Sequence, residues 1–104
     1  MKIAQIVPNW TQFHADDAIG IKAVVRDLTR GFITNGHEVT VFAPDKSTFA
    51  GVNIRWSGPS LADQGSSLMD SRAPALQRAY AKRIARELSG FDVVHSHIEH
   101  DLLP

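Results

Sequence analysis

Two short apolar runs that flank one amphipathic helical pattern constrain the fold of this chain more than any other feature. Residues 2–7 and 37–43 read as strands, and Pro8 and Pro44 end them. Between them the helical pattern ends at Asn35-Gly36, where glycine accepts a left-handed conformation without steric cost. Its apolar positions are Ile21, Val24, Val25, Leu28, Phe32 and Ile33. A strand, a helix and a strand in this order predict a parallel pair with a right-handed crossover.

The second half of the chain predicts two more strands and one more helix. Residues 52–56 and 91–95 read as strands, and residues 57–71, rich in Ser and Gly, read as a mobile loop. Residues 72–88 read as a helix whose apolar face comprises Leu76, Ala79, Tyr80, Ile84 and Leu88. The order β-α-β-β-α-β predicts an α/β, Rossmann-like, doubly wound fold with a mostly parallel sheet.

Composition narrows the classes of function. The chain contains no cysteine, which excludes disulfides, Cys-zinc sites and thiol catalysis. Lys+Arg and Asp+Glu are both 11, so no net charge attracts nucleic acid or an anionic membrane. The N-terminal apolar run stops at Pro8, too early for a signal peptide or a membrane span. We expect one cytoplasmic domain over residues 1–104, with no nucleic-acid partner. The second helix has a basic side, Arg78, Lys82, Arg83 and Arg86, which could contact a partner or an anionic membrane surface. We expect this side to be solvated and any membrane contact to be at most peripheral.

Ligands of doubly wound sheets bind at the carboxyl ends of the strands, so the segment that follows the first strand is of interest. Residues 8–20 contain neither the G-x-G-x-x-G pattern of dinucleotide folds nor a P-loop. One glycine, Gly20, precedes the helix, where free backbone N–H groups and the helix dipole suit a phosphate. A glycine that only fits the loop-to-helix junction explains the same pattern.

The segment after the last strand, VVHSHIEHDLLP, concentrates histidines and carboxylates. Residues two apart on a strand share a face, so His95 and His97 can point at one ligand. With Glu99 and His100 they form H-x-H-x-E-H, which resembles the zinc-binding H-x-H-x-D-H loop of metallo-β-lactamase-like hydrolases. A zinc hydrolase is therefore one alternative. Histidines bonded only to backbone or water at a strand end are another.

Longer stretches of the chain resemble a different family. GIKAVVRDLTRG at residues 20–31, followed by NGHEVTVFA at residues 35–43, resembles the start of family 4 glycosyltransferases. FDVVHSH at residues 91–97 and LLP at residues 102–104 resemble a later strand end of these enzymes. Members of this family are retaining enzymes of GT-B architecture, with two facing Rossmann-like domains. The resemblance implies that residues 1–104 are a partial N-terminal, acceptor-side domain, incomplete relative to a full GT-B N-terminal domain and inactive alone.

The resemblance also implies site residues at matching positions. His97 would be the catalytic histidine beside the transferred sugar, and His95 would support it from behind. Gly20 would approach the donor diphosphate and the acceptor. Ile19 replaces the first glycine of that loop and restricts the positive φ that a glycine pair allows. Lys22 replaces the usual glutamate; it could contact a phosphate, but we expect a solvated side chain.

The first loop also carries residues expected on the acceptor side. Trp10, Phe13 and His14 are predicted acceptor contacts, although packing of this loop onto the sheet edge explains them equally well. The resemblance implies a nucleoside-diphosphate sugar as donor substrate, no metal and no other cofactor. We expect an open sheet edge that pairs with the remainder of the enzyme, with a partner chain or with a second copy. A non-catalytic assembly module is the third alternative.

Overall fold

The computed structural model describes residues 1–98 of the 104-residue chain. Its main elements are β1 (Lys2–Ile6), α1 (Ile21–Thr34), β2 (Glu38–Ala43), β3 (Asn53–Trp56), α2 (Ala73–Ala85) and β4 (Val93–Ser96). Two short 3-10 turns lie at Ala15–Asp17 and Ala62–Gln64. All six predicted elements are present. The second helix ends at Ala85, earlier than the predicted residue 88. Within residues 1–98, neither helix is long and apolar enough to cross a membrane.

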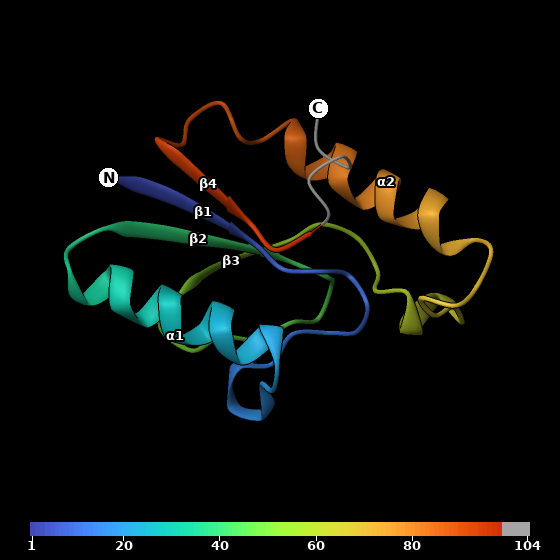
Figure 1. The fold of residues 1–104 in the computed structure, drawn as a ribbon. Helices are drawn as coiled ribbons and strands as arrows, with labels where there is room; N and C mark the ends of the chain where they lie inside the picture. Colours follow the sequence, from blue (N-terminus) through green and yellow to red (C-terminus); the bar gives the residue numbers. More distant parts are fainter. Residues whose placement is uncertain (99–104) are drawn as a thin grey trace.

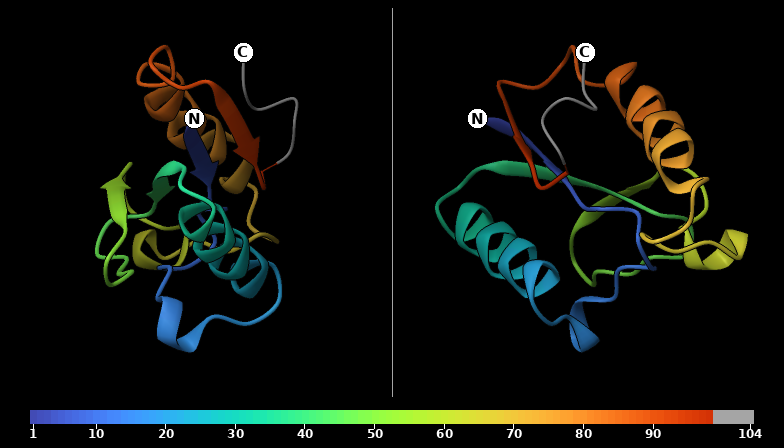
Figure 2. Two further views of the ribbon diagram at one scale, coloured as in Figure 1. Left: turned by 90° about the vertical axis from the view of Figure 1, so that its left-hand side faces the viewer. Right: turned by 45° about the vertical axis from the view of Figure 1, so that its right-hand side comes forward.

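The four strands form one sheet in the order β3-β2-β1-β4, and every pair is parallel. The helices α1 and α2 lie on opposite sides of this sheet (Figures 1 and 2). β1 is therefore central, and the segments that follow β1 and β4 leave the same edge side by side. The α/β, doubly wound prediction is confirmed. Four strands are fewer than the six of a Rossmann sheet, so the fold is an incomplete Rossmann-like domain.

The turn after α1 explains why this helix stops where the sequence predicts. Gly36 has φ +87°, in the left-handed region. Its N–H donates to the carbonyl of Ile33 at 2.9 Å, and the N–H of His37 donates to the carbonyl of Phe32 at 3.0 Å. These two bonds satisfy carbonyls that the helix end leaves free, in the Schellman arrangement. The chain is thereby turned back into β2.

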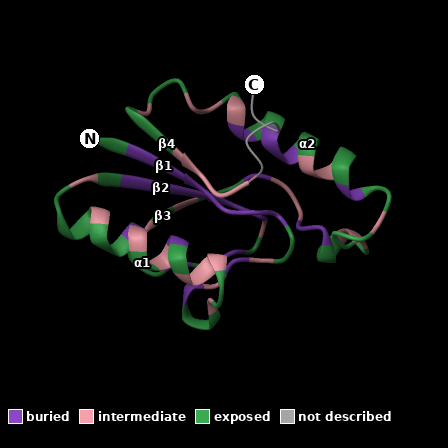
Figure 3. Ribbon diagram, viewed as in Figure 1, coloured by how far each residue is buried: buried purple, intermediate pink, exposed green. Residues whose placement is uncertain are grey.

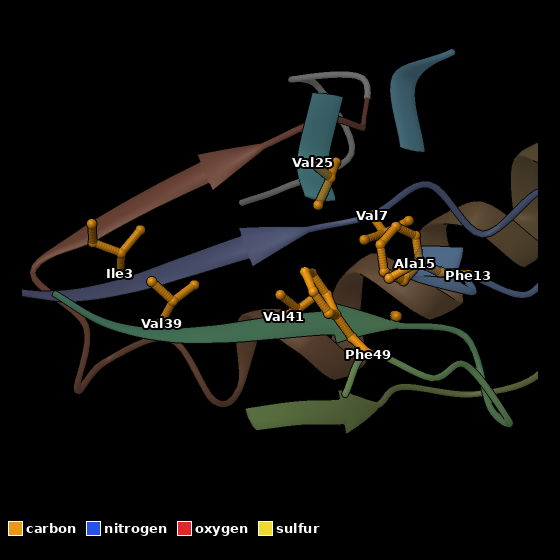
Figure 4. Close-up of a cluster of buried hydrophobic side chains, with 9 residues drawn as sticks. Ile3, Val7, Phe13, Ala15, Val25, Val39, Val41 and Phe49 are labelled. Carbon is orange, nitrogen blue, oxygen red and sulfur yellow. The ribbon is translucent and has the colours of Figure 1, made fainter. Parts of the chain in front are cut away.

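Alternate residues of β1 face the α1 side of the sheet, where Ile3 and Val7 pack in one core cluster (Figure 4). The other members are Phe13, Ala15, Val25, Val39, Val41, Ala43 and Phe49. The predicted apolar face of α1 is only partly buried, because Val24 and Ile33 are 46% and 40% exposed. Thr29 is buried instead, since its hydroxyl accepts a hydrogen bond from the buried Gln5 amide at 3.3 Å.

The opposite side of the sheet packs against α2. Ala4, Ile6 and Phe42 contact Tyr80 and Ile84, which lie one helical turn apart. The helix α2 is buried along part of its surface only (Figure 3), and both Tyr80 and Ile84 are buried. One prediction about this helix was therefore wrong: Ala79 is exposed, and Ala81, which was not predicted on the apolar face, is buried.

The segment predicted as a mobile loop is anchored to the rest of the chain by several hydrogen bonds. Leu61 is fully buried, and its N–H donates to the carbonyl of Asn9 at 2.7 Å. The N–H of Ala62 donates to the carbonyl of Trp10 at 3.1 Å. Residues 57–71 thus hold the segment that follows β1, which carries predicted site residues.

Candidate functional site

A small pocket of about 60 Å³ lies where β1 and β4 end. Three segments line it: Pro8, Asn9 and Trp10 after β1, Gln77 and Tyr80 on α2, and His97 and Ile98 after β4. The structure thus brings together His97 and Trp10, which are far apart in the sequence. It also places them at the carboxyl edge of a parallel sheet, where ligands of such folds bind.

His97 is held by the central strand of the sheet. Its backbone N–H donates to the carbonyl of Ile6 at 3.0 Å, which extends the pairing of β4 with β1 by one residue. Its ring atom Nε2 lies 3.0 Å from Oε1 of Gln5. The amide of Gln5 in turn donates from Nε2 to the hydroxyl of Thr29 on α1, at 3.3 Å. This orientation of the amide assigns the proton of the imidazole to Nε2 of His97.

The protonation state of His97 follows from its surroundings. Burial, and to a smaller extent the neighbouring His95, lowers the pKa of His97 from 6.5 to about 4. The imidazole is therefore neutral at pH 7. Because Nε2–H is donated to Gln5, the lone pair of Nδ1 remains available, and Nδ1 makes no hydrogen bond to residues 1–98. A neutral imidazole of this kind accepts a hydrogen bond from a hydroxyl and carries no charge toward an anion.

His95 lies behind His97, on the α1 side of the sheet. The centroids of the two rings are 4.5 Å apart, as expected for residues that share one face of a strand. The ring of His95 also meets Phe32 of α1 edge-on, with centroids 6.5 Å apart. This packing restricts how His97 can turn. It agrees with the supporting role predicted for His95, which stays a prediction.

Lys22 does not extend freely into water. Its ammonium group donates to the carbonyl of Gln12 at 2.9 Å and to the hydroxyl of Thr11. Partial burial lowers the pKa of Lys22. The expectation of a solvated lysine was therefore wrong. The side chain fastens the loop after β1 to the first turn of α1, and its contact with a substrate stays a prediction.

His14 also stabilises the loop that follows β1. Its Nδ1 lies 2.7 Å from the hydroxyl of Thr48, and its Nε2 lies 2.9 Å from Oε1 of Gln12. Both ring nitrogens are thus engaged, and His14 is not among the residues that line the pocket of His97. Phe13 is fully buried in the α1-side core. The acceptor contacts predicted for His14 and Phe13 stay predictions.

Gly20 and Ile19 lie at the N-terminal end of α1. Gly20 is the N-cap and has φ +58° and ψ −133°, a combination that side-chain-bearing residues rarely adopt. A Cβ placed there would meet nothing within 4 Å, so backbone geometry and not crowding requires the glycine. Ile19 is 81% exposed. The junction geometry accounts for Gly20 by itself, and its contact with a phosphate stays a prediction.

Two residues of the site were missed in the sequence. Asn9 is 2% exposed and lines the pocket, yet its Nδ2 has no hydrogen-bond partner within residues 1–98. A buried amide donor without a partner is unfavourable unless water or a ligand satisfies it. No sequence motif predicted that Asn9 belongs to the site. Gln5 carried a signal, because a glutamine interrupts an otherwise apolar strand, but its partner could not be read from the sequence.

The zinc alternative depends on residues outside those the structure describes, since Glu99 and His100 follow residue 98. Within residues 1–98, no cluster of three or more His, Asp or Glu side chains is placed to hold a metal ion. The H-x-H-x-E-H hypothesis is therefore untested by this geometry.

Comparison with known protein families gives the class of the chain. The model of the family described as Glycosyltransferase Family 4 matches residues 19–104. The match covers most of the chain and includes both helices, the strands β2, β3 and β4, and His97. The chain belongs to Glycosyltransferase Family 4. A search of curated proteins found no match. In this family 4 chain, the pocket at His97 is the candidate functional site.

Proposed function

We propose that this chain forms the acceptor-side part of a glycosyltransferase that transfers a sugar from a nucleoside-diphosphate sugar. The observation that carries the proposal is that His97, whose imidazole is neutral at pH 7, is among the residues that line the pocket at the carboxyl ends of β1 and β4. Nδ1 of a neutral imidazole accepts hydrogen bonds and is therefore suited to the hydroxyl groups of a sugar. Charged side chains are not among the residues that line this pocket.

Three residues have distinct roles in the proposed site. Nδ1 of His97 accepts a hydrogen bond from a hydroxyl of the transferred sugar, and Gln5 holds the ring in the required tautomer. Nδ2 of Asn9 donates to a sugar or acceptor oxygen, which satisfies its unpartnered buried donor. Trp10 is 37% exposed and flanks the same pocket with an aromatic face.

The donor diphosphate is proposed to lie near the start of α1, at Gly20. Backbone N–H groups at a helix N-terminus are free to bind an anion, and the helix dipole favours negative charge there. Preorganised positive ends of this kind stabilise a leaving diphosphate as its charge develops. The proposed reaction therefore uses no metal ion.

We also propose that the chain does not transfer sugar alone. The pocket at His97 measures about 60 Å³. Pockets that enclose small-molecule ligands typically measure roughly 300–1,000 Å³. Residues 1–98 thus supply one wall of a sugar site, and a further domain must close it.

A transfer assay with radiolabelled nucleoside-diphosphate sugars tests inactivity directly, because turnover by the isolated chain would contradict it. Binding is tested by NMR titration of the chain with UDP-glucose and GDP-mannose. We expect weak shifts at Asn9, Trp10 and His97, which weaken in His97→Ala. The control is His37→Ala, which changes a histidine at the opposite, amino edge of the sheet. Stoichiometric zinc that disappears in His97→Ala would favour the hydrolase alternative instead.

The proposed partner surface is the edge strand β4. Among the described strands it pairs only with β1, and Val93 and Val94 are 39% and 40% exposed. An edge strand with exposed valines is a template for another strand. We propose that the remainder of the enzyme or a second copy pairs there. Sedimentation of the chain and of Val94→Lys tests this, because the added charge should reduce any association; equal association of both would refute it.

The proposed location is the cytoplasm, which cell fractionation would check.

A further inference from the structure

A second and much larger cavity lies on the α1 side of the sheet, beyond β3. Its volume is about 730 Å³. It is lined by Ala15, Asp16, Ser47, Thr48, Phe49, Ala50, Ile54 and Trp56. None of these residues lines the pocket at His97, so the two sites are separate. The cavity is within the size range of small-molecule sites.

The cavity exists because no helix covers this part of the sheet. The connection between β2 and β3, residues 44–52, contains no helix, and it places Phe49 against the sheet on the α1 side. Phe49 packs on Phe13 with ring centroids 5.7 Å apart, and Ile54 of β3 packs beside it. These side chains form an apolar floor. α1 itself lies against β2 rather than β3.

Trp56 forms a fixed wall of the cavity. Its indole Nε1 donates to the backbone carbonyl of Ser47 at 3.0 Å, which ties the ring to the connection between β2 and β3. The side chain nevertheless stays 57% exposed. The polar edge of the indole is therefore already bonded, and the ring is open to a ligand.

The remaining lining residues set the chemistry of the ligand. Asp16 contributes a carboxylate, which accepts hydrogen bonds only, and forms no ion pair within residues 1–98. Thr48 contributes a hydroxyl that is bonded to His14 at 2.7 Å and retains further hydrogen-bonding capacity. No lysine, arginine or histidine is among the lining residues. The guanidinium of Arg30 lies over the Phe49 ring, 5.7 Å from its centroid, but Asp16 is the one charged residue of the lining, and its carboxylate disfavours an anionic ligand.

We propose that this cavity binds a pyranose ring as a second carbohydrate site. A pyranose combines an apolar face of C–H groups, which suits Trp56 and the floor, with hydroxyls that donate to the carboxylate of Asp16 and to the hydroxyl oxygen of Thr48. The ring carries no negative charge that the carboxylate of Asp16 would repel. The site is independent of the transfer reaction proposed above, because the two pockets have no lining residue in common.

NMR titration of the full chain with methyl α-D-glucopyranoside and methyl α-D-mannopyranoside tests this site. The chain has two tryptophans, and their indole signals distinguish this cavity, lined by Trp56, from the pocket at His97, lined by Trp10. We expect a saturable shift of the Trp56 signal, and a shift confined to the Trp10 signal would overturn the proposal. The expected Kd is on the order of 1 mM, since roughly −0.3 kcal/mol for each heavy atom of a methyl glycoside amounts to about −4 kcal/mol.

Substitutions separate this site from general surface binding. Asp16→Asn and Trp56→Ala should each weaken binding by about tenfold, whereas Asp17→Asn, which changes an adjacent carboxylate outside the lining, should leave it unchanged. Asp16→Asn is the decisive variant if Trp56→Ala loses the dispersed amide spectrum of the fold. The proposal is overturned if Trp56 does not respond at about a hundredfold excess over the expected Kd. A stronger response to choline or to inorganic phosphate overturns it as well, because the site would then select a charged ligand.

Discussion

His97 should make the stability of the fold depend on pH, because its imidazole is half-buried beside a second imidazole. Its pKa is lowered from 6.5 to about 4 in the folded chain, chiefly by burial and secondly by His95. In the unfolded chain the imidazole regains its ordinary pKa. Between pH 6.5 and 4 the unfolded state therefore binds more protons than the folded state. Stability is complete above pH 6.5 and decreases as the pH falls toward 4.

The size of this loss follows from the two pKa values. The difference between 6.5 and about 4 corresponds to about 3.4 kcal/mol, at 1.36 kcal/mol for each pH unit. Water reaches roughly half of the ring and screens the charge, so we reduce this figure to roughly 1–2 kcal/mol. A loss of this size is a substantial part of the stability of a small domain.

Urea unfolding at a series of pH values measures the loss. The free energy of unfolding of the unchanged chain should decrease on acidification by roughly 1–2 kcal/mol more than that of His97→Gln. His37→Gln, which removes a histidine from the amino edge of the sheet, should behave like the unchanged chain. NMR titration of the imidazole signals gives the pKa of His97 directly. A value of 6.5 or higher would refute the reasoning, as would identical pH profiles for the unchanged chain and His97→Gln.

Three further substitutions test individual contacts by urea unfolding at pH 7. Gln5→Met should cost about 1–3 kcal/mol, because it removes the acceptor of His97 and leaves a buried donor unpartnered; an unchanged free energy would show that the bond contributes nothing. Gly20→Ala should cost about 1–3 kcal/mol from the strained backbone alone, with Gly31→Ala, in the helix interior, as a control that is neutral or stabilising. Tyr80→Phe should cost about 1 kcal/mol, since the hydroxyl donates to the carbonyl of Val7 at 2.7 Å, and a neutral result would mean that water replaces that bond.

The order of the elements could be predicted because each depends on neighbouring residues. Apolar periodicity indicated the strands and helices, and Asn35-Gly36 indicated the end of α1 through the bonds that this turn makes. Burial on the helices was less predictable. Thr29 lies one helical turn after the buried Val25, and its burial is tolerated because Gln5, 24 residues earlier in the sequence, donates a hydrogen bond to its hydroxyl. A contact of that kind leaves no periodic signal.

The candidate site could also be predicted only in part from the sequence. The common face of His95 and His97 follows from strand geometry, and their rings do lie 4.5 Å apart. Asn9 could not be predicted, because its burial depends on how the segment after β1 packs on Leu61. The cavity beside Trp56 could not be predicted either. It arises from the connection between β2 and β3, whose path over the sheet has no sequence signature.

The link between Gln5 and His97 gives a physical reason for a polar residue in the central strand. Gln5 is fully buried between the aliphatic Ile3 and Val7 on one face of β1, where an amide is unfavourable unless both of its ends are bonded. Thr29 satisfies the nitrogen and His97 satisfies the oxygen. The orientation of His97 is therefore set by a strand and a helix, whereas Asn9 and Trp10 depend on a loop. In the proposed site, the hydrogen-bond acceptor on His97 is therefore held rigidly, and the loop with Asn9 and Trp10 forms the more adaptable side, where we propose that the acceptor substrate binds.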